Sequence, residues 1–183
     1  GFAMYHSAVS EYNIVDRTPY PRDPLKELSQ ACAEAGIKFC FYYSHREDWD
    51  HPGGYGNDWD YDNDWGSGLY HPVKFEQYLK EKAKPQLREL LTNYGPIGLV
   101  WFDRGMYTRE QGLEFVRLVN ELQPATLING RVGNYNLEFI GDYQTTNDNG
   151  MPPGGIEEYW ETPQTLNETW GYSKFDTLWE SPA

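Results

Sequence analysis

The feature that most limits how this chain can fold is a short apolar run at residues 97–100, which ends in Trp101-Phe102-Asp103-Arg104. The run follows the helix-breaking Tyr94-Gly95-Pro96, and its length and composition predict a fully buried strand. An apolar strand that brings an aromatic residue and then a carboxylate to its carboxyl end is typical of an α/β barrel active site. The alternative is that Asp103 only caps the turn that follows, as Asp often does.

The hydrophobic pattern around this strand alternates between helices and strands. It predicts helices over residues 24–36, 73–94 (with a kink at Pro85) and 109–123, and strands over residues 38–44, 97–103 and 126–129. Strands that alternate with helices in this way form a parallel sheet with right-handed crossovers. The pattern therefore predicts the α/β class.

Charge and aromatic content limit the possible partners. The net charge of −13 argues against nucleic acid, because phosphate binding needs clustered Lys and Arg, and no such cluster is visible. Nothing resembles a membrane span, so no membrane partner is expected. Aromatic residues make up 16% of the chain, which favours a carbohydrate partner, although large aromatics also fill cores.

Disulfide and metal patterns are absent from the sequence. The two cysteines, Cys32 and Cys40, fall on a predicted helix and a predicted strand, so we expect buried free thiols. Zinc needs three or four convergent ligands, and the histidines lack such spacing; they are His6, His45, His51 and His71. We therefore expect neither a metal nor a cofactor.

Several short motifs follow one another along the chain. In order they are Gly1-Phe2-Ala3-Met4-Tyr5-His6-Ser7, Phe41-Tyr42-Tyr43-Ser44, Trp101-Phe102-Asp103, Asn129-Gly130-Arg131, Gly141-Asp142-Tyr143, and Trp160-Glu161 with Trp170-Gly171-Tyr172. In this order and spacing they resemble glycoside hydrolase family 29, the α-L-fucosidases, over nearly the whole chain.

The resemblance implies a (β/α)8 TIM-barrel-like catalytic domain. A complete barrel needs about 250 residues. Residues 1–183 are therefore expected to be part of one glycosidase barrel domain, apparently incomplete, whose N-terminal strands and closing strand are missing. The family's fucose-binding histidine pair would precede Gly1. The rest of the barrel or an oligomeric partner would complete the site.

The resemblance also implies an activity and site residues. It implies a retaining, exo-acting hydrolase that removes terminal α-L-fucose, with fucosylated glycans or glycosides as partners. Asp103 would be the nucleophile that forms the glycosyl-enzyme. Trp101 would pack against the sugar, and Arg131 would contact fucose and keep Asp103 ionised. Tyr43 and Trp170 would complete the substrate wall.

The proton donor is where the chain departs from the family pattern. Many members carry a Glu where this chain has Asn147, and an amide has no proton to give at neutral pH. Asp148 is the first candidate, although one residue further along a strand would point the opposite way. Glu157 and Glu158 rank second, and Glu161 is interpreted as structural.

Two long segments interrupt the helix–strand alternation. Residues 45–71 include the acidic and aromatic run 58–65, which we interpret as an outer rim of the sugar site. A calcium site and a solvated loop remain alternatives for this run. Residues 147–168 are rich in Gly and Pro and are expected to arch over the pocket.

Two further hypotheses for function stay open: a catalytically impaired or carbohydrate-binding relative, and a hydrolase of the same clan acting on another sugar such as galactose.

Overall fold

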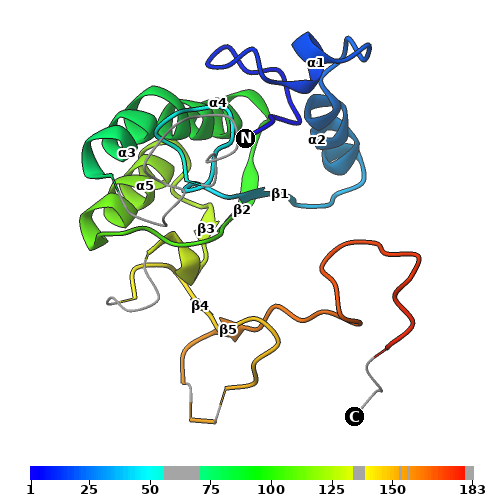
Figure 1. The fold of residues 1–183 in the computed structure, drawn as a ribbon, viewed down its shortest axis with the longest axis vertical. Coiled ribbons are helices and arrows are strands. Elements are labelled where there is room, and N and C mark those ends of the chain that lie inside the picture. The colour runs from blue at the N-terminus through cyan, green and yellow to red at the C-terminus, as the bar shows by residue number, and fades with distance from the viewer. Residues whose placement is uncertain (56–70, 134–138, 153, 156, 180–183) are drawn as a thin grey trace. The chain divides into compact units, whose positions relative to one another are not determined.

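The computed structural model describes residues 1–55, 71–133, 139–152, 154–155 and 157–179. It divides into two compact units, Gly1–Asp142 and Tyr143–Ala183, which are described in turn (Figure 1). The predicted acidic run at residues 58–65 lies outside the described residues. Among the described residues, no helix is long and apolar enough to cross a membrane.

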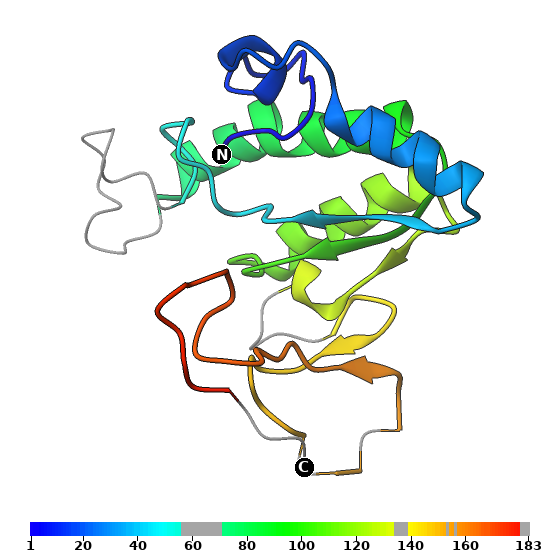
Figure 2. The ribbon, with the colours of Figure 1, turned by 90° about the vertical axis from the view of Figure 1, so that its right-hand side faces the viewer.

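The first unit is built on a parallel three-stranded sheet in the order β1-β2-β3. The strands are β1 (Phe39–Tyr43), β2 (Ile97–Phe102) and β3 (Leu127–Ile128). The helical elements are α1 (Ile14–Arg17), α2 (Pro24–Glu34), α3 (Pro72–Tyr78), η2 (Leu79–Ala83), α4 (Lys84–Asn93), α5 (Arg109–Leu122) and η3 (Gly130–Val132). The helices α4 and α5 lie side by side along the sheet (Figure 1 and Figure 2). The predicted α/β class with parallel pairing is confirmed.

The long helix predicted over residues 73–94 is present, but it is interrupted. Residues Leu79–Ala83 form a π-helical segment between α3 and α4. Pro85 has no N–H, and its ring would clash with the carbonyl four residues earlier in a regular α-helix. The expected irregularity is therefore a π segment just before Pro85. The carbonyl oxygen of Ala83, at the end of this segment, accepts a hydrogen bond from the Tyr43 hydroxyl at 2.9 Å.

The two faces of β1 differ in burial. Phe39 and Phe41 are buried with the helices, whereas Cys40 and Tyr42 are exposed on the opposite face. The expectation of buried thiols is therefore wrong: Cys40 is exposed and Cys32 is half-buried. The alternation of side chains along a strand puts Cys40 on the face that no helix covers. Within the described residues, β1 and β3 each have a sheet neighbour on one side only.

The second unit holds one parallel pair of short strands, β4 (Gln144–Thr145) and β5 (Trp160–Glu161). The Thr145 hydroxyl donates to a carboxylate oxygen of Glu161 at 2.9 Å, which agrees with a structural role for Glu161. The Asn149 N–H donates to the carbonyl oxygen of Pro163 at 2.8 Å, and the Asn149 side-chain oxygen accepts from the Thr165 N–H at 2.8 Å. These bonds fix the turn that follows β4.

Candidate active site

Three side chains meet at the carboxyl ends of the three parallel strands. Tyr42 lies on β1, Asp103 directly follows β2, and Arg131 lies in η3, just after β3. The sheet register places Tyr42 opposite Trp101, and the Asp103 N–H donates to the carbonyl oxygen of Tyr43 at 3.3 Å. Parallel strands end at the same edge of a sheet, so residues distant in the sequence come together there.

The carboxylate of Asp103 is held by three donors. Its Oδ1 accepts hydrogen bonds from Arg131 Nη1 and from the N–H of Arg104, each at 2.9 Å. Its Oδ2 accepts a hydrogen bond from the Tyr42 hydroxyl. Burial works against the ionised form, but the bonds from Tyr42 and Arg131 outweigh it and lower the pKa of Asp103 from its ordinary value. Asp103 is therefore a carboxylate at neutral pH.

Aromatic and cationic groups form layers beside this carboxylate. The Tyr42 and Trp101 rings are stacked, with centroids 5.3 Å apart and planes 20° from parallel. The Arg131 guanidinium lies 5.1 Å from the centre of the Trp101 ring, a cation–π geometry. Burial, followed by the bond to Asp103, raises the pKa of Tyr42 to about 12, so its hydroxyl stays a donor. The cluster combines an ionised carboxylate with flat apolar faces.

Tyr43 is not part of this cluster. Its hydroxyl donates to Ala83, and burial raises the pKa of Tyr43 well above its ordinary value. The side chain lies on the same face of β1 as Phe39 and Phe41 and packs against the core, and its place in the substrate wall stays a prediction. Tyr42, and not Tyr43, donates to the Asp103 carboxylate. Strand alternation could have identified Tyr42, because it shares its face with exposed Cys40.

Two predicted site residues belong to the second unit. Asp148 is exposed and lies in the turn after β4, which ends at Thr145. Since the strand has ended before Thr146, the objection that Asp148 must point away from the position of Asn147 no longer holds. Trp170 is 62% exposed and is not a core residue of this unit. The three donors to the Asp103 carboxylate described above all belong to the first unit.

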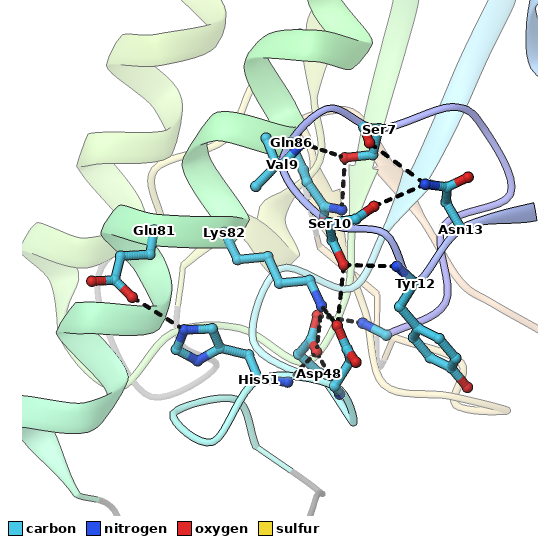
Figure 3. Close-up of polar contacts among 12 residues, drawn as sticks. Ser7, Val9, Ser10, Tyr12, Asn13, Asp48, His51, Glu81, Lys82 and Gln86 are labelled. Atoms are coloured by element: carbon cyan, nitrogen blue, oxygen red, sulfur yellow. Dashed lines mark hydrogen bonds and ion pairs between the residues drawn. The ribbon is translucent and has the colours of Figure 1, made fainter. Parts of the chain in front are cut away.

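A second polar cluster anchors the segment that follows β1 (Figure 3). Lys82, on the π segment η2, reaches Asp48 Oδ1 at 3.0 Å and Asp50 Oδ2 at 2.9 Å. Lys82 and Asp48 are both buried. A buried charge needs such a partner, so this cluster fixes the start of the segment. Nearby, Glu47 pairs with Arg104, the residue after Asp103, at 2.6 Å.

Arg104 has a left-handed backbone, with a φ of 75°, which is uncommon for a residue other than glycine. The N–H of the same residue donates to the Asp103 carboxylate. Strained backbone of this kind persists where the surroundings hold it, and it gathers at functional sites. The Glu47–Arg104 pair is one contact that holds it.

Comparison with known proteins identifies the family of this chain. A family model described as Alpha-L-fucosidase matches residues 1–183. Alpha-L-fucosidase 1 of Arabidopsis thaliana is 30% identical over 150 residues, which cover 78% of this chain and 25% of that protein. The alpha-L-fucosidase AlfC of Lactobacillus casei, solved with α-L-fucose product, is 37% identical with a TM-score of 0.79, over 98% of this chain and 57% of that one.

The alpha-L-fucosidase of Vibrio sp. strain EJY3 is also 37% identical, with a TM-score of 0.81, over 99% of this chain and 32% of that one. The chain thus spans only about a third to three-fifths of these two solved relatives and a quarter of the Arabidopsis protein. The match nevertheless covers the chain from end to end. The chain belongs to the alpha-L-fucosidase family, glycoside hydrolase family 29.

Proposed function

We propose that this chain carries the nucleophile of a retaining, exo-acting α-L-fucosidase that removes terminal α-L-fucose from glycans or glycosides. The observation that carries the proposal is the state of Asp103: a carboxylate at a strand end, kept ionised by Arg131 and Tyr42 beside the Trp101 ring. In support, AlfC has been solved with 4-nitrophenyl-α-L-fucopyranoside and with Fuc-α(1,6)-GlcNAc.

The mechanism has two steps. A carboxylate oxygen of Asp103 attacks the anomeric carbon of fucose, the bond to the leaving oxygen breaks, and a second carboxyl gives that oxygen its proton. Water then attacks the glycosyl-enzyme, gives a proton back to the second carboxyl, and releases fucose and the Asp103 carboxylate. The first step needs Asp103 ionised, which its hydrogen bonds ensure.

Arg131 and Trp101 have separate tasks in this scheme. The Arg131 guanidinium is 5% exposed and bonds Asp103 Oδ1, so it keeps the nucleophile charged and fixes its direction. The Trp101 ring, which contacts both Tyr42 and Arg131, lies next to the reacting carboxylate, and we propose that it packs against the sugar there. We also propose Trp170, which is exposed, as a further substrate contact.

For the proton donor we propose Asp148, with Glu157 and Glu158 as the alternatives. Asp148 lies on a turn that is held to residues 163–165 through Asn149. A proton donor needs a side chain that is held in place, and these bonds hold the turn within the second unit. Glu157 and Glu158 are also exposed in the second unit.

We also propose that residues 1–183 are part of one (β/α)8 barrel domain. In support, β1 and β3 have open edges among the described residues, and the exposed face of β1 carries Cys40 and Tyr42. Further strands would cover these edges. The other part of the barrel, or an oligomeric partner, would then supply the remaining contacts to fucose.

Hydrolysis of 4-nitrophenyl α-L-fucoside by the full-length protein that contains this chain tests the function. We expect release of nitrophenol together with fucose of retained anomeric configuration, seen by NMR before mutarotation. A matched 4-nitrophenyl galactoside should react far more slowly, and residues 1–183 alone should be inactive. Faster turnover of the galactoside would assign another sugar, and binding of fucose without turnover would indicate a carbohydrate-binding relative.

Replacing Tyr42 with Phe should make the enzyme more sensitive to acid. Asp103 has a lowered pKa, so activity is present above that pKa and is lost as the pH falls through it. Without the Tyr42 hydroxyl the pKa of Asp103 rises, and this loss moves to higher pH. Since a hydrogen bond to a charged group contributes about 1.5–3 kcal/mol, kcat/KM should fall about tenfold or more.

The control for Tyr42→Phe is Tyr43→Phe, which removes a neighbouring hydroxyl that bonds Ala83 instead of Asp103. It should lower the melting temperature and leave the acid limb of the kcat/KM profile in place. The same acid limb in both variants would contradict the role given to Tyr42.

A further inference from the structure

A buried histidine that the mechanism above does not use connects two strand ends. His45 follows β1 and is 0% exposed. Its Nδ1 lies 3.0 Å from the carbonyl oxygen of Asp103, and its Nε2 lies 3.1 Å from the carbonyl oxygen of Val132. Val132 is the neighbour of Arg131 in η3. One ring therefore contacts the main chain at, or next to, both partners of the Asp103–Arg131 ion pair.

Both the ring and the main chain of His45 are held in place. The ring packs against Phe102 and Phe115, with centroids 4.8 Å and 5.1 Å away. The Tyr78 hydroxyl, at the end of α3, donates to the carbonyl oxygen of His45 at 3.2 Å. Three layers of the unit thus meet at this residue: the strand ends, the helix α3 and the helix α5.

A histidine at this position needs an explanation, because its surroundings are apolar. Burying a polar ring is unfavourable unless its nitrogens are hydrogen-bonded. A neutral imidazole has one N–H, so it donates to one of the two carbonyl oxygens at a time. Burial lowers the pKa of His45 to about 4; the nearby charges are Arg46, which lowers it further, and Asp103, which raises it. At neutral pH the ring is therefore uncharged and donates to one of these two carbonyl oxygens.

We propose that His45 is a positioning residue, which fixes the distance between the Asp103 carboxylate and the Arg131 guanidinium by packing between the main chain at Asp103 and Val132 and donating a hydrogen bond to one of these two carbonyl oxygens. The proposal rests on the nucleophile role of Asp103. Without the ring and its hydrogen bond, the ends of β2 and β3 can separate, and the 2.9 Å contact between the two side chains weakens. A carboxylate that loses hydrogen bonds is poorly oriented for attack on the anomeric carbon and is more easily protonated.

Three replacements of His45 separate the two contacts. An Asn side chain places its N–H₂ where Nδ1 was, facing Asp103, and a Gln side chain places it where Nε2 was, facing Val132. Leu offers no donor to either. For His45→Leu in the full-length enzyme we expect kcat to fall about tenfold to 100-fold with little change in KM. The acid limb of the kcat/KM profile should move to higher pH, because the pKa of Asp103 rises.

Recovery distinguishes positioning from packing. Either His45→Asn or His45→Gln should have a higher kcat than His45→Leu, and should lose activity in acid at a pH closer to that of the native enzyme. Which of the two does so depends on which nitrogen carries the proton in the native ring. The matched control is Val119→Ala, which removes fully buried volume from α5 and takes away no hydrogen-bonding group. It should lower the melting temperature and leave the acid limb unchanged. If neither Asn nor Gln differs from Leu, or from the Val119 variant, the proposal is overturned.

A readout without turnover keeps the two proposals apart. A carbon-13 NMR titration of the Asp103 carboxyl should give a higher pKa in His45→Leu than in the native protein, whether or not fucosides are hydrolysed. If the native protein fails to hydrolyse fucosides, the proposed function fails while this titration still tests the positioning role. If His45→Leu does not fold, the same comparison between Asn and Gln decides. An unchanged Asp103 pKa in every folded variant overturns the inference.

Discussion

Replacing Asp103 with Asn is expected to lower kcat/KM for fucosides about 10⁴-fold or more. The amide cannot form the glycosyl-enzyme, yet its oxygen can still accept from Arg131 and its N–H₂ can donate to the Tyr42 hydroxyl oxygen, which preserves the shape of the site. The fold should therefore survive. Asp103→Ala should be equally inactive but less stable, because it removes the carboxylate partner of a guanidinium that is only 5% exposed. Kinetics with an aryl fucoside, combined with thermal melting, measures both effects.

The control for Asp103 is Asp142→Asn. The Asp142 carboxylate also lies in the first unit and accepts a hydrogen bond from the Ile128 N–H at 2.7 Å, but it has no place in the proposed chemistry. This variant should lose some stability and keep most of its activity. If Asp103→Asn retained more than about a tenth of the native rate, Asp103 could not be the nucleophile.

The position of this carboxylate could be predicted from the sequence because local rules determine it. An apolar run between a Gly-Pro turn and an Asp predicts a buried strand, and β2 ends at Phe102, directly before Asp103. Parallel pairing then brings the ends of neighbouring strands to one edge, which places Arg131 beside Asp103. Strand alternation adds Tyr42 to this group, because Tyr42 and Tyr43 lie on opposite faces of β1 and the Tyr42 hydroxyl is the one that bonds Asp103.

The contacts of His45 could not be predicted from the sequence. Its partners are main-chain carbonyl oxygens at positions 58 and 87 residues further along the chain. A carbonyl group is present at every residue and leaves no mark in the sequence pattern. The π segment η2 is a similar case: Pro85 predicts an irregular helix, but the contacts of Tyr43 and Lys82 with this segment depend on packing between distant elements.

The largest substrate-dependent effect is expected for Asp148→Ala. If Asp148 is the proton donor, the variant should still cleave 4-nitrophenyl fucoside, because nitrophenolate leaves without protonation. It should lose about two to four orders of magnitude on fucosylated glycans, whose sugar alkoxide is a poor leaving group without general acid help. Paired kinetics on an aryl fucoside and a fucosyl disaccharide measures the difference between the two losses.

Azide gives the second half of the test on Asp148→Ala. Hydrolysis of the glycosyl-enzyme also needs this carboxyl, as a general base for water. Azide attacks without a base, so added azide should speed turnover of the aryl fucoside by the variant and form a fucosyl azide.

Glu157→Ala and Glu158→Ala are the matched controls, since each removes an exposed carboxyl of the same unit. If one of them shows the substrate split and azide rescue instead, that Glu is the proton donor. An equal loss on both substrates in Asp148→Ala would place the proton donor elsewhere, because a residue needed only for folding or binding affects good and poor leaving groups alike.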